Sequence, residues 1–331
     1  MTTNTATARA HSNIALAKYW GKADVPLNLP AVPSISLTLA PLLTATRVTF
    51  STDFKADSLS LDGQPANEKE LRRAAELLQR VRLATGQRAF AAVESSNNFP
   101  TAAGLASSAS GFCALAAAAF AAAGGEVDLQ QVSAFARQSS ASAARSVYGG
   151  LVELPVGQSG DAELAAVPLY GPDYWDLRIV VAVTAQGRKA VGSTEGMGLT
   201  EATSPYYRAW VESAPVLAER VRQGLASRDL CQVGEAMEQS TLAMHACAMA
   251  AHPGLIYFQP ATLAAISAVR RLREEGVPVY FTADAGPHVK ALCTSAEVER
   301  VKARLEATDG VLRTMVATPG VGVQVQLGAG S

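Results

Sequence analysis

The sequence has few cysteines, few charged side chains and no excess of either charge. Its four cysteines, Cys113, Cys231, Cys247 and Cys293, form no Cys-x-x-Cys pair, which excludes the usual patterns of a zinc site or a disulfide framework. Reduced thiols are typical of the cytoplasm, where we expect this protein to reside. The 28 Lys and Arg residues against 29 Asp and Glu give a net charge of −1, so no overall basic field attracts nucleic acid or an anionic membrane.

Targeting signals, membrane spans and several common catalytic motifs are also missing. The N-terminal segment MTTNTATARAHSN is polar and lacks the apolar core of a signal peptide. The stretch 100–123 is Ala-rich and interrupted by glycine and serine, which favours a buried helix over a transmembrane one. No Walker A, Gly-x-Ser-x-Gly or His-Glu-x-x-His pattern occurs. His245 and His252 are therefore expected to be structural.

What is present is a globular chain with room for two domains. Its 331 residues are 49% hydrophobic, which suits a well-packed interior. Strand and helix patterns are mixed but do not strictly alternate, which predicts an α+β fold with largely antiparallel sheets. The Gly-rich connection AQGRKAVGSTEGMG follows an apolar strand pattern and predicts two domains, 1–185 and 186–331.

Hydrophobic periodicity and cap residues predict the individual elements. Asn67 with Glu70 forms a capping-box pattern, Asp128 is expected to cap a second helix, and Ser295 is expected to cap the last one. The expected helices cover 67–82, the Ala-rich stretch up to Gly124, 128–135, 205–222, 229–246, 262–274 and 296–306. The expected strands cover 47–50, 59–61, 90–93, 177–183, 277–281 and 321–327.

The segment PTAAGLASSASGFCALAAAAFAAA, residues 100–123, places a small-residue loop directly before a long helix. Gly104 allows the backbone to approach an anion closely, and Ser107 and Ser108 add hydroxyl donors. The helix N-terminus supplies free N–H groups and the positive end of the dipole. This pattern predicts a nucleotide or polyphosphate site and a phosphoryl-transfer enzyme. The alternative is that the small residues only allow tight helix packing.

Two more segments bring residue types suited to anionic substrates. Lys18, Tyr19 and Lys22 in HSNIALAKYWGK offer mobile positive charge and a hydroxyl donor. Arg145 lies in the serine-rich SSASAARSVYGG and can offer two parallel donors to a carboxylate or phosphate. The alternatives are an edge strand with solvated lysines and a helix C-terminus stabilised by its arginine.

A single carboxylate and a lysine segment complete the candidates. Asp284 lies in DAGP, directly after an apolar strand pattern. In phosphoryl transfer, such a carboxylate orients the attacking hydroxyl or takes its proton. Plain turn chemistry is the alternative. Lys189, followed by STEGM, predicts either a loop that reaches phosphates or an interdomain linker.

Together these segments resemble the GHMP kinase superfamily and, within it, the diphosphomevalonate decarboxylase family. The segments ARAHSNIALAKYWGK, NNFPTAAGLASSASGF, Ser-x-Ser-x-x-Arg-Ser with Tyr-Gly-Gly, STEGM, MHACAMAAHPGLIYF and DAGP follow the family's order and approximate spacing. KYWGK and DAGP point to the decarboxylase rather than to a generic kinase. The likeness runs from about Ala8 to the end of the chain.

The resemblance implies a fold and a reaction. The N-terminal domain would be similar to ribosomal protein S5 domain 2 and would meet a C-terminal α+β domain at an active-site cleft, in a homodimer. The reaction would belong to the mevalonate pathway of isoprenoid biosynthesis and need ATP and Mg²⁺. It would convert mevalonate 5-diphosphate into isopentenyl diphosphate, carbon dioxide, ADP and phosphate.

The resemblance also implies residue roles. Asp284 is similar to the catalytic carboxylate beside the 3-hydroxyl, and Arg145, helped by Asn13, to the group that holds the substrate carboxylate. Lys189 is similar to a catalytic loop lysine that reaches the ATP phosphates, and Ser107 is expected near ATP-bound Mg²⁺. The substrate-binding group would comprise Asn13, Lys18, Tyr19, Lys22, Ser140, Ser142 and Arg145. The nucleotide-binding group would comprise Asn97, Pro100, Gly104, Leu105, Ala106, Ser107, Ser108, Lys189 and Ser193.

One position departs from the family pattern. Thr194 stands where some bacterial members carry an arginine that helps to grip the diphosphate. Phosphomevalonate decarboxylase and mevalonate 3-kinase are therefore alternative activities. A catalytically silent GHMP-fold binding protein is the alternative from another class.

Overall fold

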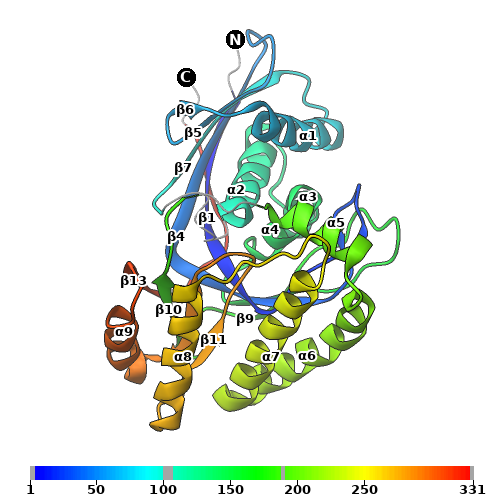
Figure 1. Ribbon diagram of the computed structural model, residues 1–331. Helices are drawn as coiled ribbons and strands as arrows, with labels where there is room; N and C mark the ends of the chain where they lie inside the picture. Colours follow the sequence, from blue (N-terminus) through cyan, green and yellow to red (C-terminus); the bar gives the residue numbers. More distant parts are fainter. Residues whose placement is uncertain (1–3, 100–106, 188–190, 329–331) are drawn as a thin grey trace.

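Two long N-terminal strands organise the main sheet. β1 (Asn4–Ala17) and β4 (Ser34–Ser51) pair antiparallel along most of their length and run side by side in Figure 1. The computed structural model describes residues 4–99, 107–187 and 191–328. β4 also pairs in succession with β8 (Leu151–Leu154), β13 (Arg313–Pro319) and β7 (Phe90–Asn97). It therefore joins both halves of the chain in one twelve-stranded sheet.

Further strands extend this sheet from β7 and from β13, which pair with successive parts of the β4 edge opposite β1. β7 pairs with β5 (Ser58–Leu61), and β13 pairs with β10 (Leu177–Val183). Within the described ranges every pairing except β5 with β7 is antiparallel, which confirms the expected sheet type. The other strands are β2 (Lys22–Asp24), β3 (Leu29–Pro30), β6 (Gln64–Pro65), β9 (Val167–Tyr170), β11 (Tyr280–Thr282), β12 (Val289–Thr294) and β14 (Gln324–Leu327).

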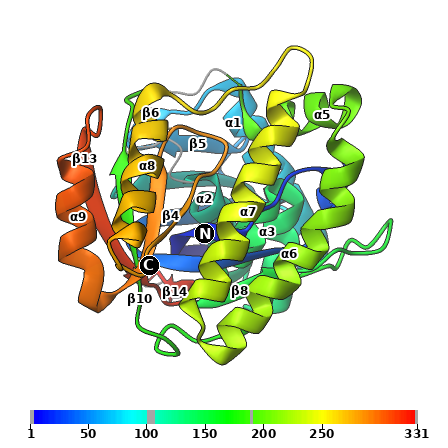
Figure 2. The same ribbon diagram turned by 60° about the horizontal axis from the view of Figure 1, so that its bottom comes forward.

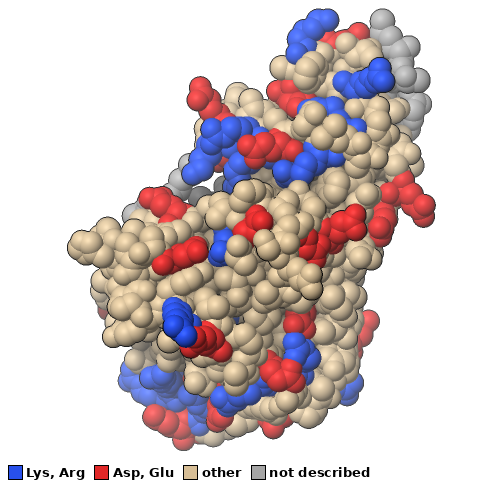
Figure 3. All heavy atoms as spheres, turned by 90° about the vertical axis from the view of Figure 1, so that its right-hand side faces the viewer, with Lys and Arg blue, Asp and Glu red and all other residues tan. Residues whose placement is uncertain are grey.

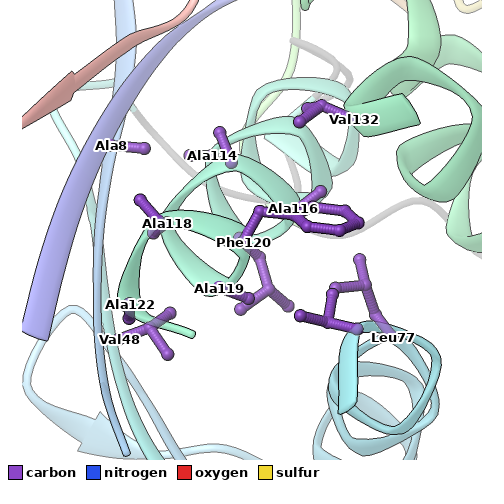
Figure 4. Packing of buried hydrophobic residues seen from close by; sticks show 14 of the residues in the cluster. Ala8, Val48, Leu77, Ala114, Ala116, Ala118, Ala119, Phe120, Ala122 and Val132 are labelled. Atoms are coloured by element: carbon purple, nitrogen blue, oxygen red, sulfur yellow. The ribbon is translucent and has the colours of Figure 1, made fainter. Parts of the chain in front are cut away.

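The Ala-rich helix α2 (Ser107–Ala122) is buried on nearly all sides, as its sequence predicts. Small side chains let a helix approach its neighbours closely, and Ala8 of β1 and Val48 of β4 lie beside α2 in Figure 4. Leu77 of α1 lies against another side of the helix. A helix hydrophobic on every face is typical of a core element. The packing fixes the N-terminus of α2 relative to the sheet.

The other helices cover the sheet in two groups. α1 (Glu68–Thr85), α3 (Leu129–Ser139) and α4 (Ala141–Arg145) pack with α2 in the upper part of Figure 1. In Figure 2, α6 and α7 lie side by side across the molecule from α8 and α9. The C-terminal helices are α5 (Ser193–Thr203), α6 (Tyr207–Ser227), α7 (Leu230–Met249), α8 (Pro260–Glu274) and α9 (Val298–Glu306).

Two of the three predicted helix caps are confirmed. The Asn67 side chain accepts from the Glu70 N–H in a complete capping box, and the Asp128 side chain accepts from the N–H of Gln130. The prediction for Ser295 is wrong, because this residue begins a 3₁₀ turn ahead of α9. Its hydroxyl donates to the carboxylate of Asp176 instead. The Ser295 side chain therefore holds the 3₁₀ turn next to the start of β10.

Several element boundaries differ from the sequence predictions. β4 begins at Ser34, well before the expected 47–50. Ile35, Leu37 and Leu39 alternate with hydroxyl residues at 34, 36 and 38, a strand pattern that the sequence analysis missed. β11 covers Tyr280–Thr282 rather than 277–281, and β14 begins at Gln324 rather than 321. The stretch 185–198, expected as a connection, contains the start of α5 at Ser193. The expected domain boundary at residue 185 stays a prediction.

No helix in the described part of the chain is long and apolar enough to cross a membrane. The Ala-rich helix α2 is a buried core helix, as the sequence predicts.

Candidate active site

A cavity of about 780 Å³ lies where the two halves of the chain meet. The end of β1, the first turn of α2, α4 and the turn between β11 and β12 all contribute to its wall. The first residues of α5 line it as well. Figure 3 shows the side of the molecule that carries α1 and α5, with groups of Lys and Arg side chains in both its upper and its lower parts, among Asp and Glu.

The wall of the cavity carries more positive than negative side chains. Such a surplus favours ligands with several negative charges, since a buried charge needs an opposite partner. The cationic lining residues are Lys18, Lys22, Lys69, Arg73 and Arg145, and the anionic ones are Glu195 and Asp284. The cavity therefore suits a polyanionic ligand.

Asp284 lies in this wall between two buried lysines. Its Oδ1 accepts from Lys18 Nζ at 2.7 Å, and its Oδ2 accepts from Lys290 Nζ at 3.3 Å. The side chains of Lys18 and Lys290 are 1% and 4% exposed, whereas that of Asp284 is 30% exposed. Asp284 thus keeps a face open to the cavity. The alternative of a solvated edge lysine at position 18 is wrong.

The two lysines determine the charge of Asp284. Burial by itself raises the pKa of the carboxyl, but the combined attraction and hydrogen bonds of Lys18 and Lys290 outweigh burial and hold this pKa well below its usual range. Burial also lowers the pKa of Lys18 to about 8, against the opposing attraction of Asp284. At neutral pH the pair is therefore an ammonium and a carboxylate.

Backbone contacts hold the Asp284 turn against the end of β1. The carbonyl oxygen of Ala15 accepts from Lys18 Nζ at 3.0 Å and from Thr282 Oγ1 at 3.3 Å. Thr282 Oγ1 also lies 3.0 Å from Thr241 Oγ1 on α7. These hydrogen bonds connect three distant parts of the chain, so the position of Asp284 is fixed by β1 and α7 as well as by its own hairpin.

Arg145 approaches the same cavity from α4. It is 2% exposed, and its Nη1 donates to Ser34 Oγ at 2.6 Å. Asn13 supports the segment, since its Nδ2 donates to Ser146 Oγ at 2.8 Å and to the Ser142 carbonyl at 3.0 Å. Burial lowers the pKa of Arg145 to about 10, which leaves it charged at neutral pH. Within the described ranges no carboxylate forms an ion pair with it.

Besides Nε1 of Trp20, two buried polar atoms of cavity-lining residues lack hydrogen-bond partners among the described residues. They are the hydroxyl of Tyr19 and Nε of Arg145. An unpaired buried donor costs about 1–3 kcal/mol, so native proteins usually provide a partner. Both groups line the cavity, and a ligand oxygen would satisfy them. Burial raises the pKa of Tyr19, so its hydroxyl is a donor at neutral pH.

The KYWGK segment is fixed in place by α6. Trp210 Nε1 donates to the Trp20 carbonyl at 2.7 Å, and the Trp20 ring meets Tyr257 edge-on at 6.0 Å between centroids. Gly21 has φ +109°, and a Cβ there would collide with the hydroxyl of Tyr207. Only glycine fits this position. Lys18 and Lys22, on either side of the segment, are thereby directed into one cavity.

Two helix N-termini meet at this cavity. Ser107 and Ser108 begin α2, and Ser193 and Thr194 begin α5; all four residues line the wall. Helix N-termini present free N–H groups and a positive dipole end to anions. Their convergence adds to the attraction that the cationic side chains exert.

The structure brings most of the predicted site residues together. Asn97 does not line the cavity; its Oδ1 accepts from Thr44 Oγ1 at 2.5 Å. Five predicted residues lie outside the described residues, namely Pro100, Gly104, Leu105, Ala106 and Lys189. The predicted residues that line the cavity are Asn13, Lys18, Tyr19, Lys22, Ser107, Ser108, Ser140, Ser142, Arg145, Ser193 and Asp284.

The sequence analysis missed several residues of the site. Lys69 and Arg73 line the cavity from α1, four residues apart on one helix face. They resemble the solvated face of any amphipathic helix, so no sequence signal distinguishes them. Lys290 lies six residues after Asp284 on β12, and the sequence analysis missed it because its neighbours in the strand are mainly apolar. Asn28 and Glu195 also line the cavity.

No group of three His, Cys, Asp or Glu side chains that could hold a metal by itself occurs in the part of the chain that the structure describes. Oxygen ligands at the cavity include hydroxyls, such as that of Ser107, and the carboxylates of Glu195 and Asp284. Mg²⁺ prefers oxygen ligands, keeps several waters and is commonly bound through substrate phosphates. The residues therefore fit a magnesium ion that arrives with a polyphosphate.

Comparisons with known proteins agree on both halves of the chain. Residues 10–165 match the family model described as "Diphosphomevalonate decarboxylase-like N-terminal domain". Residues 179–315 match the model described as "Mevalonate 5-diphosphate decarboxylase C-terminal domain". Together, the two family models cover the segments of both halves of the chain that line the cavity.

Similar proteins are found among curated sequences and solved structures. The chain is 35% identical to phosphomevalonate decarboxylase of Haloferax volcanii, over 90% of this chain and 90% of the relative. It is 33% identical to diphosphomevalonate decarboxylase of Candida albicans, over 89% of this chain and 86% of the relative. The structure of MDDEF in complex with MVAPP, AMPPCP and magnesium has a TM-score of 0.91 and 37% identity, and the match covers 98% of this chain and 99% of that one.

Proposed function

The chain belongs to the diphosphomevalonate decarboxylase family, and on this premise we propose that it converts mevalonate 5-diphosphate and ATP into isopentenyl diphosphate, carbon dioxide, ADP and phosphate. The observation that carries the proposal is the convergence of Asp284 and Arg145 on one cationic cavity. The fold is the GHMP kinase fold of mevalonate diphosphate decarboxylase structures. A structural relative binds MVAPP and AMPPCP together, which supports a cavity for two polyanions.

The first chemical step is transfer of the γ-phosphoryl group of ATP to the 3-hydroxyl oxygen. Asp284 accepts a hydrogen bond from that hydroxyl and aims its oxygen at the phosphorus. The bond between the γ-phosphorus and ADP breaks as the new bond forms, and the hydroxyl proton passes to an oxygen of the transferred phosphoryl group. The hydroxyl thereby becomes a phosphate leaving group. Positioning and electrostatic stabilisation account for most of the catalysis in such transfers.

The second step is fragmentation of the phosphorylated intermediate. The bond between C3 and oxygen breaks, and its electron pair leaves with phosphate. The electrons of the bond to the carboxylate carbon form the new double bond as carbon dioxide departs. Arg145 holds the carboxylate until this point, and Asn13 fixes the segment that carries Arg145. Paired guanidinium donors match the geometry of a carboxylate.

The diphosphate end of the substrate is assigned to the cationic and hydroxyl groups at the end of β1 and around α4. Lys22, Tyr19, Ser140 and Ser142 line this region. Lys18 contributes its charge from beside Asp284. The unpaired Tyr19 hydroxyl supports the assignment, because a phosphate oxygen would accept its hydrogen bond.

ATP and Mg²⁺ are assigned to the N-terminus of α2. Ser107 and Ser108 begin this helix and line the cavity. Bound Mg²⁺ neutralises phosphate charge during transfer. Ser107 would hold the ion together with the phosphates, and Ser193 of α5 faces the same space. Asn97, Pro100, Gly104, Leu105, Ala106 and Lys189 keep their predicted nucleotide-binding roles.

A second candidate function is phosphomevalonate decarboxylation. Two observations favour it: Thr194 lines the cavity where some family members carry a diphosphate-gripping arginine, and one relative with 35% identity is a phosphomevalonate decarboxylase. A site for a monophosphate needs less positive charge than one for a diphosphate. The five cationic side chains of the wall favour the diphosphate.

An assay that couples ADP release to carbon dioxide detection tests the proposal on mevalonate, its 5-phosphate and its 5-diphosphate. We expect the highest kcat/KM with the 5-diphosphate, and a further fall in its KM in the Thr194→Arg variant. Higher kcat/KM with the 5-phosphate would identify a phosphomevalonate decarboxylase. ADP without carbon dioxide would identify a mevalonate 3-kinase, and neither product, despite ligand binding, a silent binding protein.

Assembly and location complete the proposal. We expect a cytoplasmic homodimer, as the family resemblance implies, with domains 1–185 and 186–331. Light scattering coupled to gel filtration tests the dimer against the monomer mass of 34.4 kDa. Cell fractionation tests the location.

A further inference from the structure

Lys290 is a buried lysine that the proposed reaction leaves without a role. It is 3% exposed and lies on β12, where it pairs with Thr282 of β11 and Val181 of β10. It does not line the cavity, so it does not contact a ligand there. Lysines are almost never buried without an opposite charge, since removing an ammonium group from water is costly. Its charge faces Asp284.

The two lysines hold different oxygens of one carboxylate. Lys18 Nζ donates to Oδ1 at 2.7 Å and Lys290 Nζ donates to Oδ2 at 3.3 Å. Lys18 follows β1 and Lys290 belongs to β12, so the carboxylate is held from two independent elements. Two contacts on opposite oxygens fix its rotation. Each oxygen retains a further lone pair for a ligand hydroxyl.

We propose that Lys290 is a positioning residue of the reaction, which fixes the Asp284 carboxylate toward the substrate hydroxyl and keeps it ionised. This inference rests on the proposed function and deepens it. Lys290 acts through Asp284 and touches no reacting atom. Lys18, by contrast, lines the cavity itself.

The titratable groups that face Asp284 come from four parts of the chain. They are Lys18 beyond β1, Lys290 on β12, Arg145 on α4 and His245 on α7. Burial, followed by the charge of Lys18, lowers the pKa of His245 to about 4, so this histidine is neutral at physiological pH. Three cations therefore surround one carboxylate. Burial raises the pKa of Asp284, but the attraction and hydrogen bonds of Lys18 and Lys290 outweigh burial and hold this pKa well below its usual range.

The role of Asp284 follows from this environment. A carboxylate held so strongly in its ionised form is a weak proton acceptor, because general bases work best with a pKa near the operating pH. It is an effective hydrogen-bond acceptor. Asp284 therefore orients the hydroxyl, and Lys290 is one of the groups that keep the Asp284 carboxylate ionised.

The test compares Lys290→Met and Lys290→Gln, which remove the charge, with Lys290→Arg, which keeps it. Lys302→Met is the matched control, because Lys302 lies at the surface of α9 and, among the described residues, forms an ion pair only with Glu306, at 4.0 Å. We expect both neutral variants to lower kcat at least about tenfold. The KM values for ATP and substrate should stay within about twofold, and the acid limb of the kcat profile should move to higher pH. In Lys290→Arg, the acid limb of the kcat profile should stay at its wild-type pH.

A wild-type kcat and acid limb in both neutral variants would overturn the proposal. So would an equal loss in all three variants with raised KM and lowered Tm, which a merely structural role predicts.

A second readout does not depend on turnover. Aspartate is labelled with ¹³C at the carboxyl carbon, and the Asp284 signal is assigned by its loss in Asp284→Asn. In the wild type and Lys290→Arg this carboxyl should remain ionised at pH values near about 4, where ordinary aspartates titrate. In the neutral variants its midpoint should rise by at least about one pH unit. An unchanged midpoint overturns the proposal even if the enzyme proves to act on another substrate.

Discussion

Asp284 has the central place among the individual residues because three cations surround it while one face stays open to the cavity. A carboxylate in that setting stays ionised over the whole physiological pH range. Its position is determined by contacts with the end of β1, with α7 and with its own hairpin. The charge and the position of the Asp284 side chain are therefore set before any ligand binds.

Asp284→Ala should keep the fold and ATP binding but lower kcat by about 10³–10⁴-fold, since the hydroxyl loses its orienting partner. The decarboxylation assay measures kcat, and fluorescence titration with a nucleotide measures binding. Asp176→Ala, at an exposed carboxylate paired with Arg178, is the control. Near-normal turnover of Asp284→Ala would contradict the assigned role.

Lys18 should set an alkaline limit to activity. Its pKa is lowered to about 8, so the ammonium that pairs with Asp284 is lost as pH rises through that value. We expect kcat/KM, which reports the free enzyme, to fall above about pH 8. The contribution of Lys18 to the free energy of unfolding should rise between pH 8 and the ordinary value of 10.5, because there only the unfolded chain binds the extra proton. A flat kcat/KM up to pH 10 would refute the assignment.

Arg145→Lys should raise the KM for the substrate about tenfold and lower kcat, because lysine cannot offer two parallel donors to a carboxylate. Steady-state kinetics with the 5-diphosphate measures both constants. Arg178→Lys on the surface is the matched control and should leave them unchanged. Unaltered kinetics in Arg145→Lys would argue against carboxylate binding at this position.

Single residues were predictable from the sequence where a segment combined unusual residue types. KYWGK, DAGP and the serine-rich segment indicated Lys18, Asp284 and Arg145 as candidate site residues, and all three line the cavity. Arg73 and Lys290 were not predictable. The first lies on an ordinary amphipathic helix, and the second lies inside a buried strand, where only the three-dimensional structure reveals its partner.

At the scale of elements, α2 shows how packing positions chemistry. Its alanines allow β1 and β4 to approach, so the first turn of the helix reaches the cavity wall at a fixed place. The two interpretations of this segment, tight packing and anion binding, are therefore compatible. Small residues along the helix allow close packing, and we propose that those at its start bind an anion.

Ala118→Leu should destabilise the protein by about 1–3 kcal/mol, because the larger side chain must displace neighbours in a close-packed region. Ala118 is fully buried, on the side of α2 that faces the strands in Figure 4. Ala303→Leu at an exposed position of α9 is the control and should be nearly neutral. Thermal unfolding measures both. Equal Tm values for the two variants would contradict the packing described for α2.

The sequence predictions missed the first part of β4 and the start of α5. Ser34 and Thr38 of β4 turn their hydroxyls inward, to Arg145 and to the Tyr148 carbonyl, so both faces of this strand segment are buried although its sequence alternates hydroxyl and aliphatic residues. α5 begins among glycine and serine because its first turn lines the cavity. Both deviations occur next to the site.

At the scale of the whole molecule, the long β1–β4 pair explains why residues so distant in sequence meet. β4 pairs with strands from both halves of the chain. The fold class and the antiparallel sheet were predictable from the order of elements. The cavity itself was expected only through the family resemblance, because no local pattern reveals that Asn13, Arg145 and Asp284 share a wall.

A crystal structure of the complex with mevalonate 5-diphosphate and a non-hydrolysable ATP analogue tests the shared cavity most directly. The distances to measure join the Asp284 carboxylate to the 3-hydroxyl and the Arg145 guanidinium to the substrate carboxylate. Both should be about 2.7–3.1 Å, with the γ-phosphate analogue facing the same hydroxyl. A complex in which the hydroxyl lies beyond reach of Asp284, or in which the two ligands occupy separate sites, would contradict the proposed mechanism.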